Sequence, residues 1–147
     1  MIQDQPLSRE AFKAFFDLPT RWMDNDVYGH VNNVQYYSFF DTAIAHYLIE
    51  KGGLDPKRSE SIGYCIESGC RYRKPITFPE RMTAGIRVTK LGRTSVRYEI
   101  GLFREDDQET AADGYFVHVF VDRATEKPTP LSPTLREALS KIMAPST

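Results

Sequence analysis

The sequence predicts an α+β fold in which a curled, antiparallel, five-stranded sheet surrounds one long central helix. One long segment has a helical pattern that is apolar around most of its circumference, and most of the chain after it alternates between apolar and polar residues. Short polar connections separate the alternating segments, which suits antiparallel hairpins because parallel neighbours need long crossovers. A sheet that has to cover an apolar helix on several sides must curl around it.

The N-terminal part is expected to hold a short packing helix followed by the first strand. Apolar residues of the segment Leu7–Leu18 recur at roughly helical spacing, and Ser8 is a suitable N-cap. Pro19 is expected to end this helix. Residues 20–23 then lead into a polar cluster as a short strand would.

The central helix is predicted over Asn33–Lys51, a stretch without proline or glycine. Asn32 or Asn33 can cap its start, and Gly52-Gly53 is a stop signal after its end. Polar residues occupy only a narrow stripe of the predicted helix. We therefore expect it to be buried on nearly all sides.

Alternating patterns predict the rest of the sheet. The expected strands are Ser61–Arg73, Arg81–Leu91, Ser95–Phe103 and Thr110–Asp122. A last amphipathic helix is predicted over Ser132–Met143, with Ser132 as its N-cap. A lone curled sheet leaves long edge strands exposed, so pairing with a second copy, as a homodimer or homotetramer, is expected.

Composition narrows the classes of function. The chain has 147 residues, 41% of them hydrophobic and 27% charged, which fits a single domain over residues 1–147. The formal net charge of -1 supplies no excess of basic residues, so nucleic acid is not an expected partner. No run of about 18 apolar residues and no signal-peptide pattern occurs, which predicts a cytoplasmic protein that does not span a membrane.

Neither a disulfide nor a metal site is expected. Cys65 and Cys70 lie five positions apart, too far along an extended strand to bridge, so both are predicted to be free thiols. His30, His46 and His118 are scattered, and no CxxC pair is present.

The densest polar cluster lies between the first predicted strand and the central helix, over Arg21–Asn33. The first N–H groups of a helix lack intrahelical acceptors, and they can polarise a carbonyl and hold an oxyanion. A carboxylate on the same loop, Asp26, could attack a thioester carbonyl directly or deprotonate a water that does so. Gly29 permits the sharp turn that such a loop requires.

These residues resemble the 4-hydroxybenzoyl-CoA thioesterase-like hot-dog enzymes, which are related to the acyl-ACP thioesterases of plants. The resemblance covers about Thr20 to Asp122. It rests on Asp24-Asn25-Asp26, Gly29-His30-Val31-Asn32-Asn33, Tyr36-Tyr37, Tyr72-Arg73-Lys74-Pro75, Phe78-Pro79-Glu80 and Leu91-Gly92-Arg93-Thr94-Ser95.

The resemblance implies a hot-dog fold, dimers or tetramers, and catalysis without a cofactor. It places the catalytic carboxylate on Asp26 and the oxyanion-binding backbone N–H on Asn33. Some relatives carry a histidine at the position of Asn33; here His30 of the same loop is the remaining histidine candidate, as a catalytic group or as a residue that holds the loop.

Further residues are candidates for substrate binding: Gly29, Asn32, Tyr36, Glu67, Lys74 and Arg93. Asn32 could instead only cap the helix, and Tyr36 could belong to the core. Glu67 could face the site across a dimer or point outward, whereas Lys74 and Arg93 could bind CoA phosphates or line a solvated face. Asp24 is expected to be structural, paired with Arg21.

The expected function is therefore that of an acyl-CoA thioesterase acting on a small to medium acyl group. Two alternatives remain open. The chain could be an acyl-ACP thioesterase, or it could be a non-catalytic hot-dog module that binds acyl-CoA or serves in assembly.

Overall fold

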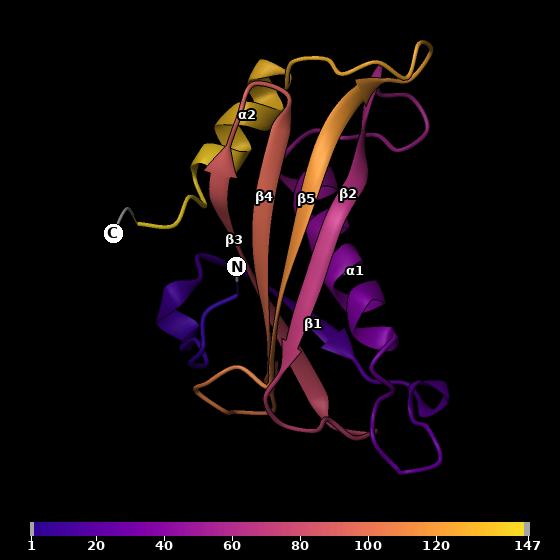
Figure 1. Cartoon of the computed structure of the whole chain (residues 1–147), viewed down its shortest axis with the longest axis vertical. Coiled ribbons are helices and arrows are strands. Elements are labelled where there is room, and N and C mark those ends of the chain that lie inside the picture. The colour runs from indigo at the N-terminus through magenta and orange to yellow at the C-terminus, as the bar shows by residue number, and fades with distance from the viewer. Residues whose placement is uncertain (1, 146–147) are drawn as a thin grey trace.

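The computed structural model describes residues 2–145 and contains one five-stranded antiparallel sheet (Figure 1). The strands lie in the order β1-β3-β4-β5-β2. The elements are a 3-10 turn over Arg9–Ala11, β1 (Ala14–Pro19), a 3-10 turn over Trp22–Asp24, α1 (Gln35–Glu50), β2 (Ser61–Tyr72), β3 (Arg81–Leu91), β4 (Ser95–Arg104), β5 (Ala112–Asp122) and α2 (Pro133–Ser140).

Helix α1 packs lengthwise on one face of the sheet, which we call the inner face (Figure 1). Its buried side chains are Tyr36, Phe39, Phe40, Ala43, Ile44, Tyr47 and Leu48. Phe40 is fully buried and lies so close to β5 that a Cβ atom on Gly114 would overlap its ring. The predicted α+β, hot-dog arrangement of a curled sheet around a central helix is confirmed.

The expectation that α1 is buried on nearly all sides is wrong for one face. Ser38, Asp41, Thr42 and Ile49 are exposed, because α1 contacts β1, β3, β4 and β5 but leaves the edge strand β2 largely uncovered. The helix also begins at Gln35, two residues later than predicted.

The prediction for the N-terminal part is wrong. The segment expected to be helical, Leu7–Leu18, contains no α-helix. Its first half has a 3-10 turn, and its second half belongs to strand β1, which pairs with β3. The pairing supplies β1 with backbone hydrogen bonds, and its apolar residues fall on both faces: Phe16 and Leu18 reach the core, whereas Phe15 stays on the outer face. Residues 20–23, expected as a short strand, do not form one, and residues 22 and 23 belong to the Trp22–Asp24 turn.

The expectations for the later strands and for α2 are confirmed. The four later strands lie within a few residues of their predicted bounds, and Ser132 caps α2 by accepting a hydrogen bond from the Leu135 N–H. Cys65 and Cys70 are both free. Among the described residues, no helix is long and apolar enough to cross a membrane.

Replacing Gly114 by alanine should lower the free energy of unfolding by about 1–3 kcal/mol, because the added Cβ meets the buried Phe40 ring. Urea unfolding measures the change. Phe40→Leu in the Gly114→Ala background should recover part of the loss by making room for the methyl group. An unchanged unfolding midpoint in Gly114→Ala would contradict the tight packing of α1 on β5.

Candidate functional site

The loop between β1 and α1 is anchored by a buried carboxylate. Asp24 has no exposed surface, and its side chain accepts hydrogen bonds from the Arg21 backbone N–H at 2.8 Å and from the Arg21 guanidinium at 2.8 Å. The Asp24 carbonyl also accepts a hydrogen bond from the Asn32 N–H at 2.8 Å. Asp24 therefore joins both ends of the loop, as expected for a structural residue paired with Arg21.

The tip of the loop is a tight turn that brings Asp26 back toward the start of α1. The Asp26 N–H donates to the His30 carbonyl at 2.9 Å, and the Gly29 N–H donates to the Asp26 carbonyl at 3.0 Å. Gly29 has a φ of 80°, a left-handed conformation that glycine adopts at little cost. The glycine thus allows the reversal that the loop requires.

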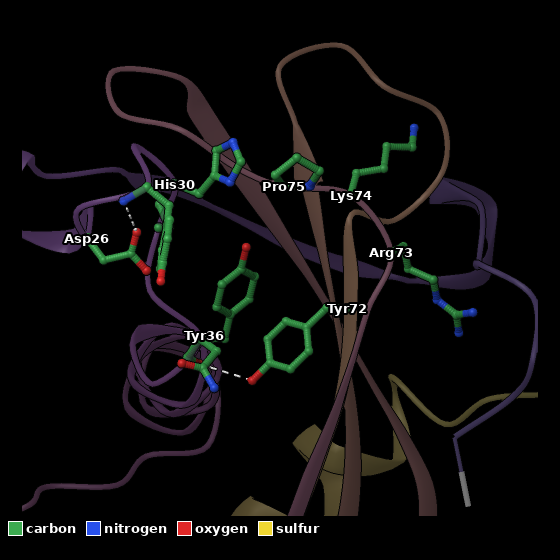
Figure 2. A pocket seen from close by; sticks show the side chains of 10 residues that line it. Asp26, His30, Tyr36, Tyr72, Arg73, Lys74 and Pro75 are labelled. Carbon is green, nitrogen blue, oxygen red and sulfur yellow. Dashed lines mark hydrogen bonds between the residues drawn. The ribbon is translucent and has the colours of Figure 1, made fainter.

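The Asp26 carboxylate is held in a defined orientation (Figure 2). One oxygen accepts a hydrogen bond from the Tyr28 N–H at 2.9 Å, and the other accepts one from the Asn32 side-chain amide at 3.2 Å. A carboxylate has about four acceptor positions, so these two bonds leave lone pairs available for chemistry. Asn32 thereby orients Asp26, and its side-chain oxygen also accepts a hydrogen bond from the Val34 N–H at 3.0 Å.

Asn33, two residues before the start of α1, carries an unpaired donor. Within residues 2–145, no hydrogen bond joins the Asn33 N–H to another protein group. The Asn33 carbonyl is fixed from two sides, by the Tyr36 N–H at 3.3 Å and by the Tyr72 hydroxyl at 3.1 Å. The N–H therefore belongs to a held segment and remains free to bind an oxygen of a ligand.

Asp26 and Asn33 line one cavity of about 490 Å³, which we call the first cavity (Figure 2). Its lining residues are Asp26, Tyr28, His30, Val31, Asn33, Tyr36, Tyr72, Arg73, Lys74 and Pro75. The Tyr36 and Tyr72 rings meet edge to face at a centroid distance of 4.9 Å. The structure thus brings four predicted site residues beside Asp26: His30, Asn33, Tyr36 and Lys74.

The two cations of this cavity differ in what they can bind. The Arg73 guanidinium is largely buried and is occupied by Asp113 at 2.7 Å and by backbone carbonyls of the N-terminal segment. Lys74 is more exposed, and its contact with Asp107 is longer, at 3.3 Å. Lys74 is therefore the cation better placed to meet an anionic group at the mouth of the cavity.

A second cavity of about 950 Å³ lies on the other side of the loop and shares Asp26 and Tyr28 with the first. Gly29 and Asn32, two predicted substrate-binding residues, line this cavity. Its apolar residues include Trp22 and Val27, whose side chains are largely exposed. The loop therefore presents apolar surface on the side away from Lys74.

Two predicted residues lie outside both cavities within one chain. The Glu67 carboxylate accepts a hydrogen bond from the Tyr115 hydroxyl at 2.8 Å on the outer face of the sheet. Arg93 belongs to the β3–β4 hairpin, which lies beside α2 at the opposite end of the sheet from the loop before α1 (Figure 1). The position of this hairpin depends on the direction in which each strand runs, and the sequence pattern alone does not specify those directions.

The structure also adds residues that the sequence reasoning did not include in the site. Tyr72 and Arg73 come from the end of β2, and Tyr28 from the loop itself. The sequence motif that contains Lys74 also contains Tyr72 and Arg73. Their position next to Lys74 in the chain could therefore have identified them as site residues. Among residues 2–145, no group of three or more His, Cys, Asp or Glu side chains is arranged to hold a metal ion.

Comparisons with known proteins agree with this architecture. A sequence profile of the thioesterase-like superfamily matches residues 20–139. The chain is 25% identical over 120 residues to the long-chain acyl-CoA thioesterase FadM of Escherichia coli K12, a match that covers 80% of this chain and 90% of FadM. The matched residues of the profile include every residue that lines the first cavity.

Solved structures of other proteins have the same fold as this chain. The crystal structure of the PA5185 protein from Pseudomonas aeruginosa has a TM-score of 0.95 and 48% sequence identity, and the match covers 97% of this chain and 100% of that one. The DHNA-CoA thioesterase of Staphylococcus aureus has a TM-score of 0.78 and 25% identity, with coverage of 88% of this chain and 89% of that one.

Substitutions at Gly29 test whether the loop depends on its left-handed turn. Nothing lies within 4 Å of a Cβ placed there, so the effect comes from the backbone alone. Gly29→Val should lower the free energy of unfolding by about 1–2 kcal/mol, whereas Gly29→Asn should cost less because asparagine tolerates this conformation. Chemical unfolding measures both, and equal losses for the two variants would refute the role of the turn.

Proposed function

Because the chain belongs to the thioesterase-like superfamily, we propose that it hydrolyses the thioester of an acyl-CoA, using Asp26 at a carbonyl held by the start of α1. The chain is accordingly a thioester hydrolase. The observation that carries the proposal is that Asp26, whose carboxylate is oriented, and Asn33, whose backbone N–H is unpaired, line the same cavity.

The proposed reaction needs two groups from the protein. The Asn33 N–H, helped by the partial positive charge at the helix start, stabilises the oxygen of the carbonyl as it gains negative charge. Asp26 either attacks the carbonyl carbon or removes a proton from the water that attacks it. The C–S bond then breaks, and the thiolate of CoA leaves and takes up a proton. When water attacks, the free acid forms directly; when Asp26 attacks, a second step in which water hydrolyses the acyl–Asp26 anhydride frees the acid and restores the carboxylate.

The surroundings of Asp26 suit either route. Its two hydrogen bonds, from Tyr28 and Asn32, fix the direction of the carboxylate. His30 lines the same cavity and is exposed, so it lies within the region where the leaving thiolate would be protonated. We assign His30 an auxiliary role in this protonation and not the role of nucleophile or base, which Asp26 already fills.

The charges of the first cavity favour binding of CoA on the side of β2. Lys74 stands at the mouth of this cavity and is available to a phosphate group of CoA. No positively charged residue lines the second cavity. CoA is therefore the acyl carrier that we propose, in a cytoplasmic protein that needs no cofactor.

A homo-oligomer is part of the proposal. Strand β2 is 12 residues long, forms one edge of the sheet and is exposed over much of its length. Long exposed edges invite pairing with another strand, and a second copy supplies an identical edge. Pairing at β2 would place partner residues beside Tyr72, at the wall of the first cavity.

A non-catalytic binding module is the less favoured reading. Such a module has no need for a carboxylate oriented by two hydrogen bonds beside an unpaired backbone donor. The arrangement of Asp26 and Asn33 is instead what carbonyl chemistry requires.

The proposed activity is tested by thiol release from a panel of acyl-CoAs with short, medium, long and aromatic acyl groups. Wild type should release CoA, and Asp26→Asn should lower kcat/KM by about 10²–10⁴-fold, because the amide is neither a base nor a good nucleophile. Asp17→Asn, on the exposed side of β1, is the matched control and should keep wild-type activity. Release that survives Asp26→Asn would overturn the mechanism.

Tyr72→Phe tests whether the hydroxyl that bonds the Asn33 carbonyl positions the oxyanion site. Burial raises the pKa of Tyr72, so the hydroxyl stays protonated and donates across the working pH range. Its loss should lower kcat by about 2- to 10-fold, the worth of one neutral hydrogen bond, with little change in KM. Tyr64→Phe on the same strand is the control, and equal kinetics of the two variants would contradict this role.

A further inference from the structure

The Tyr36 side chain carries a hydroxyl that is free to donate a hydrogen bond inside the first cavity. Tyr36 lines this cavity although its exposed fraction is only 3%. Within residues 2–145, the hydroxyl donates to no carbonyl, carboxylate or other side chain. Buried polar groups in proteins almost always have a partner. A buried donor without an acceptor in the protein is available to an oxygen atom of a bound ligand.

The position of Tyr36 in the helix directs this hydroxyl toward the carbonyl site. Tyr36 is the second residue of α1, and helical side chains lean toward the N-terminus of their own helix. The side chain therefore reaches back past the helix start, toward Asn33. The Tyr36 N–H donates to the Asn33 carbonyl at 3.3 Å, so both residues belong to one turn. Figure 2 shows the Tyr36 hydroxyl pointing away from the helix and into the cavity that Asp26 also lines.

The Tyr36 ring is held on several sides. The rings of Tyr72 and Phe39 meet it edge to face, at centroid distances of 4.9 Å and 6.2 Å. A hydrogen bond with the Ile76 backbone lowers the pKa of Tyr36, which means that the Ile76 N–H donates to the hydroxyl oxygen. Because this bond occupies the acceptor side of the hydroxyl, the proton remains free for another partner.

The acidity of this hydroxyl separates two possible roles. Burial raises the pKa of Tyr36 to about 12, and the bond from Ile76 offsets only part of the rise. An ordinary thiol has a pKa of about 8.5, so transfer of the Tyr36 proton to the leaving thiolate is unfavourable by roughly 10³-fold. The hydroxyl therefore keeps its proton, and its role is that of a hydrogen-bond donor. Such a bond is strongest to an oxygen that carries negative charge.

The other hydroxyls of the first cavity do not have this combination of burial and freedom. The Tyr72 hydroxyl is already bonded to the Asn33 carbonyl at 3.1 Å. The Tyr28 side chain is 83% exposed, so water competes for its hydroxyl. A donor in a site that excludes water stabilises developing charge far more than one in contact with water. Tyr36 is therefore the hydroxyl best suited to act on the thioester.

We propose that the Tyr36 hydroxyl is a catalytic hydrogen-bond donor, which binds the thioester oxygen together with the Asn33 N–H. This inference rests on the proposed acyl-CoA hydrolysis and gives the oxyanion site a second donor. The thioester oxygen gains negative charge as the carbonyl carbon is attacked, so the bond from Tyr36 strengthens along the reaction. Tyr36 thus contributes more to kcat than to the binding of the substrate.

The kinetic test is Tyr36→Phe, which removes only the hydroxyl. Tyr37→Phe is the matched control, because Tyr37 is the next residue of α1 and does not line the first cavity. Tyr36→Phe should lower kcat by about 10²–10³-fold, the loss typical of one oxyanion donor, and leave KM within about threefold. This loss should be the same at every pH from about 6 to about 9, since the hydroxyl does not titrate there. Tyr37→Phe should behave as wild type.

A binding test detects the same contact without hydrolysis. Calorimetry compares two acyl-CoA analogues of equal chain length: a ketone with a methylene in place of the sulfur, and a thioether with a methylene in place of the carbonyl. Tyr36→Phe should weaken binding of the ketone by about 2- to 10-fold, because one neutral hydrogen bond is lost. Binding of the thioether should not change, which also shows that the variant is folded.

Three outcomes would overturn the inference: an unchanged kcat in Tyr36→Phe, a loss confined to KM, or equal weakening of the ketone and the thioether. Any of them leaves the proposed hydrolysis intact if Asp26→Asn still abolishes the release of CoA. Selective weakening of the ketone in a protein that releases no CoA from any thioester would support the contact with the carbonyl and refute the proposed hydrolysis.

Discussion

The burial of α1 against the inner face of the sheet is the constraint from which the rest of the structure follows. Phe40 has no exposed surface, and Gly114 allows it to approach β5 closely because any side chain there would collide with the ring. The sheet curls around the helix that it covers. The start of α1 is thereby fixed beside the end of β2 and the start of β3, so that a loop leading into the helix must pass over that end of the sheet (Figure 1).

The two acids of this loop have different roles because their environments differ. Asp24 is fully buried and is occupied by Arg21, so it holds the loop and has no capacity left for a ligand. Asp26, two residues later, accepts two hydrogen bonds and still lines an open cavity. The chain thus uses one carboxylate to build the loop and presents the other at a helix start, where developing negative charge is favoured.

The elements that the sequence predicted well are those with long, unambiguous patterns. Strand β3 has its predicted bounds, and α1 is apolar over enough of its length to be recognised, although its start shifted to Gln35. The segment that became β1 was predicted as a helix, because its aromatic residues fit both periods over so short a stretch. Only pairing with β3 decides between them, and that is a tertiary interaction.

Some residues of the candidate site were likewise predicted from the sequence, and others were not. Asp26, His30 and Asn33 lie close in sequence, so the motif already implied their proximity, whereas Lys74 was predicted because CoA phosphates need positively charged partners. Tyr72 reaches Asn33 across 39 positions of sequence, and Arg93 lies at the far end of the sheet. Both placements depend on strand direction and register, which a single sequence does not specify.

The central claim, that Asp26 and the Asn33 N–H act on one thioester carbonyl, is tested most directly by a crystal structure of Asp26→Asn with an acyl-CoA bound. The account predicts a thioester oxygen about 3 Å from the Asn33 nitrogen, with the carbonyl carbon facing the side chain of residue 26. A thioester bound elsewhere, or held with its carbonyl turned away from the start of α1, would contradict it.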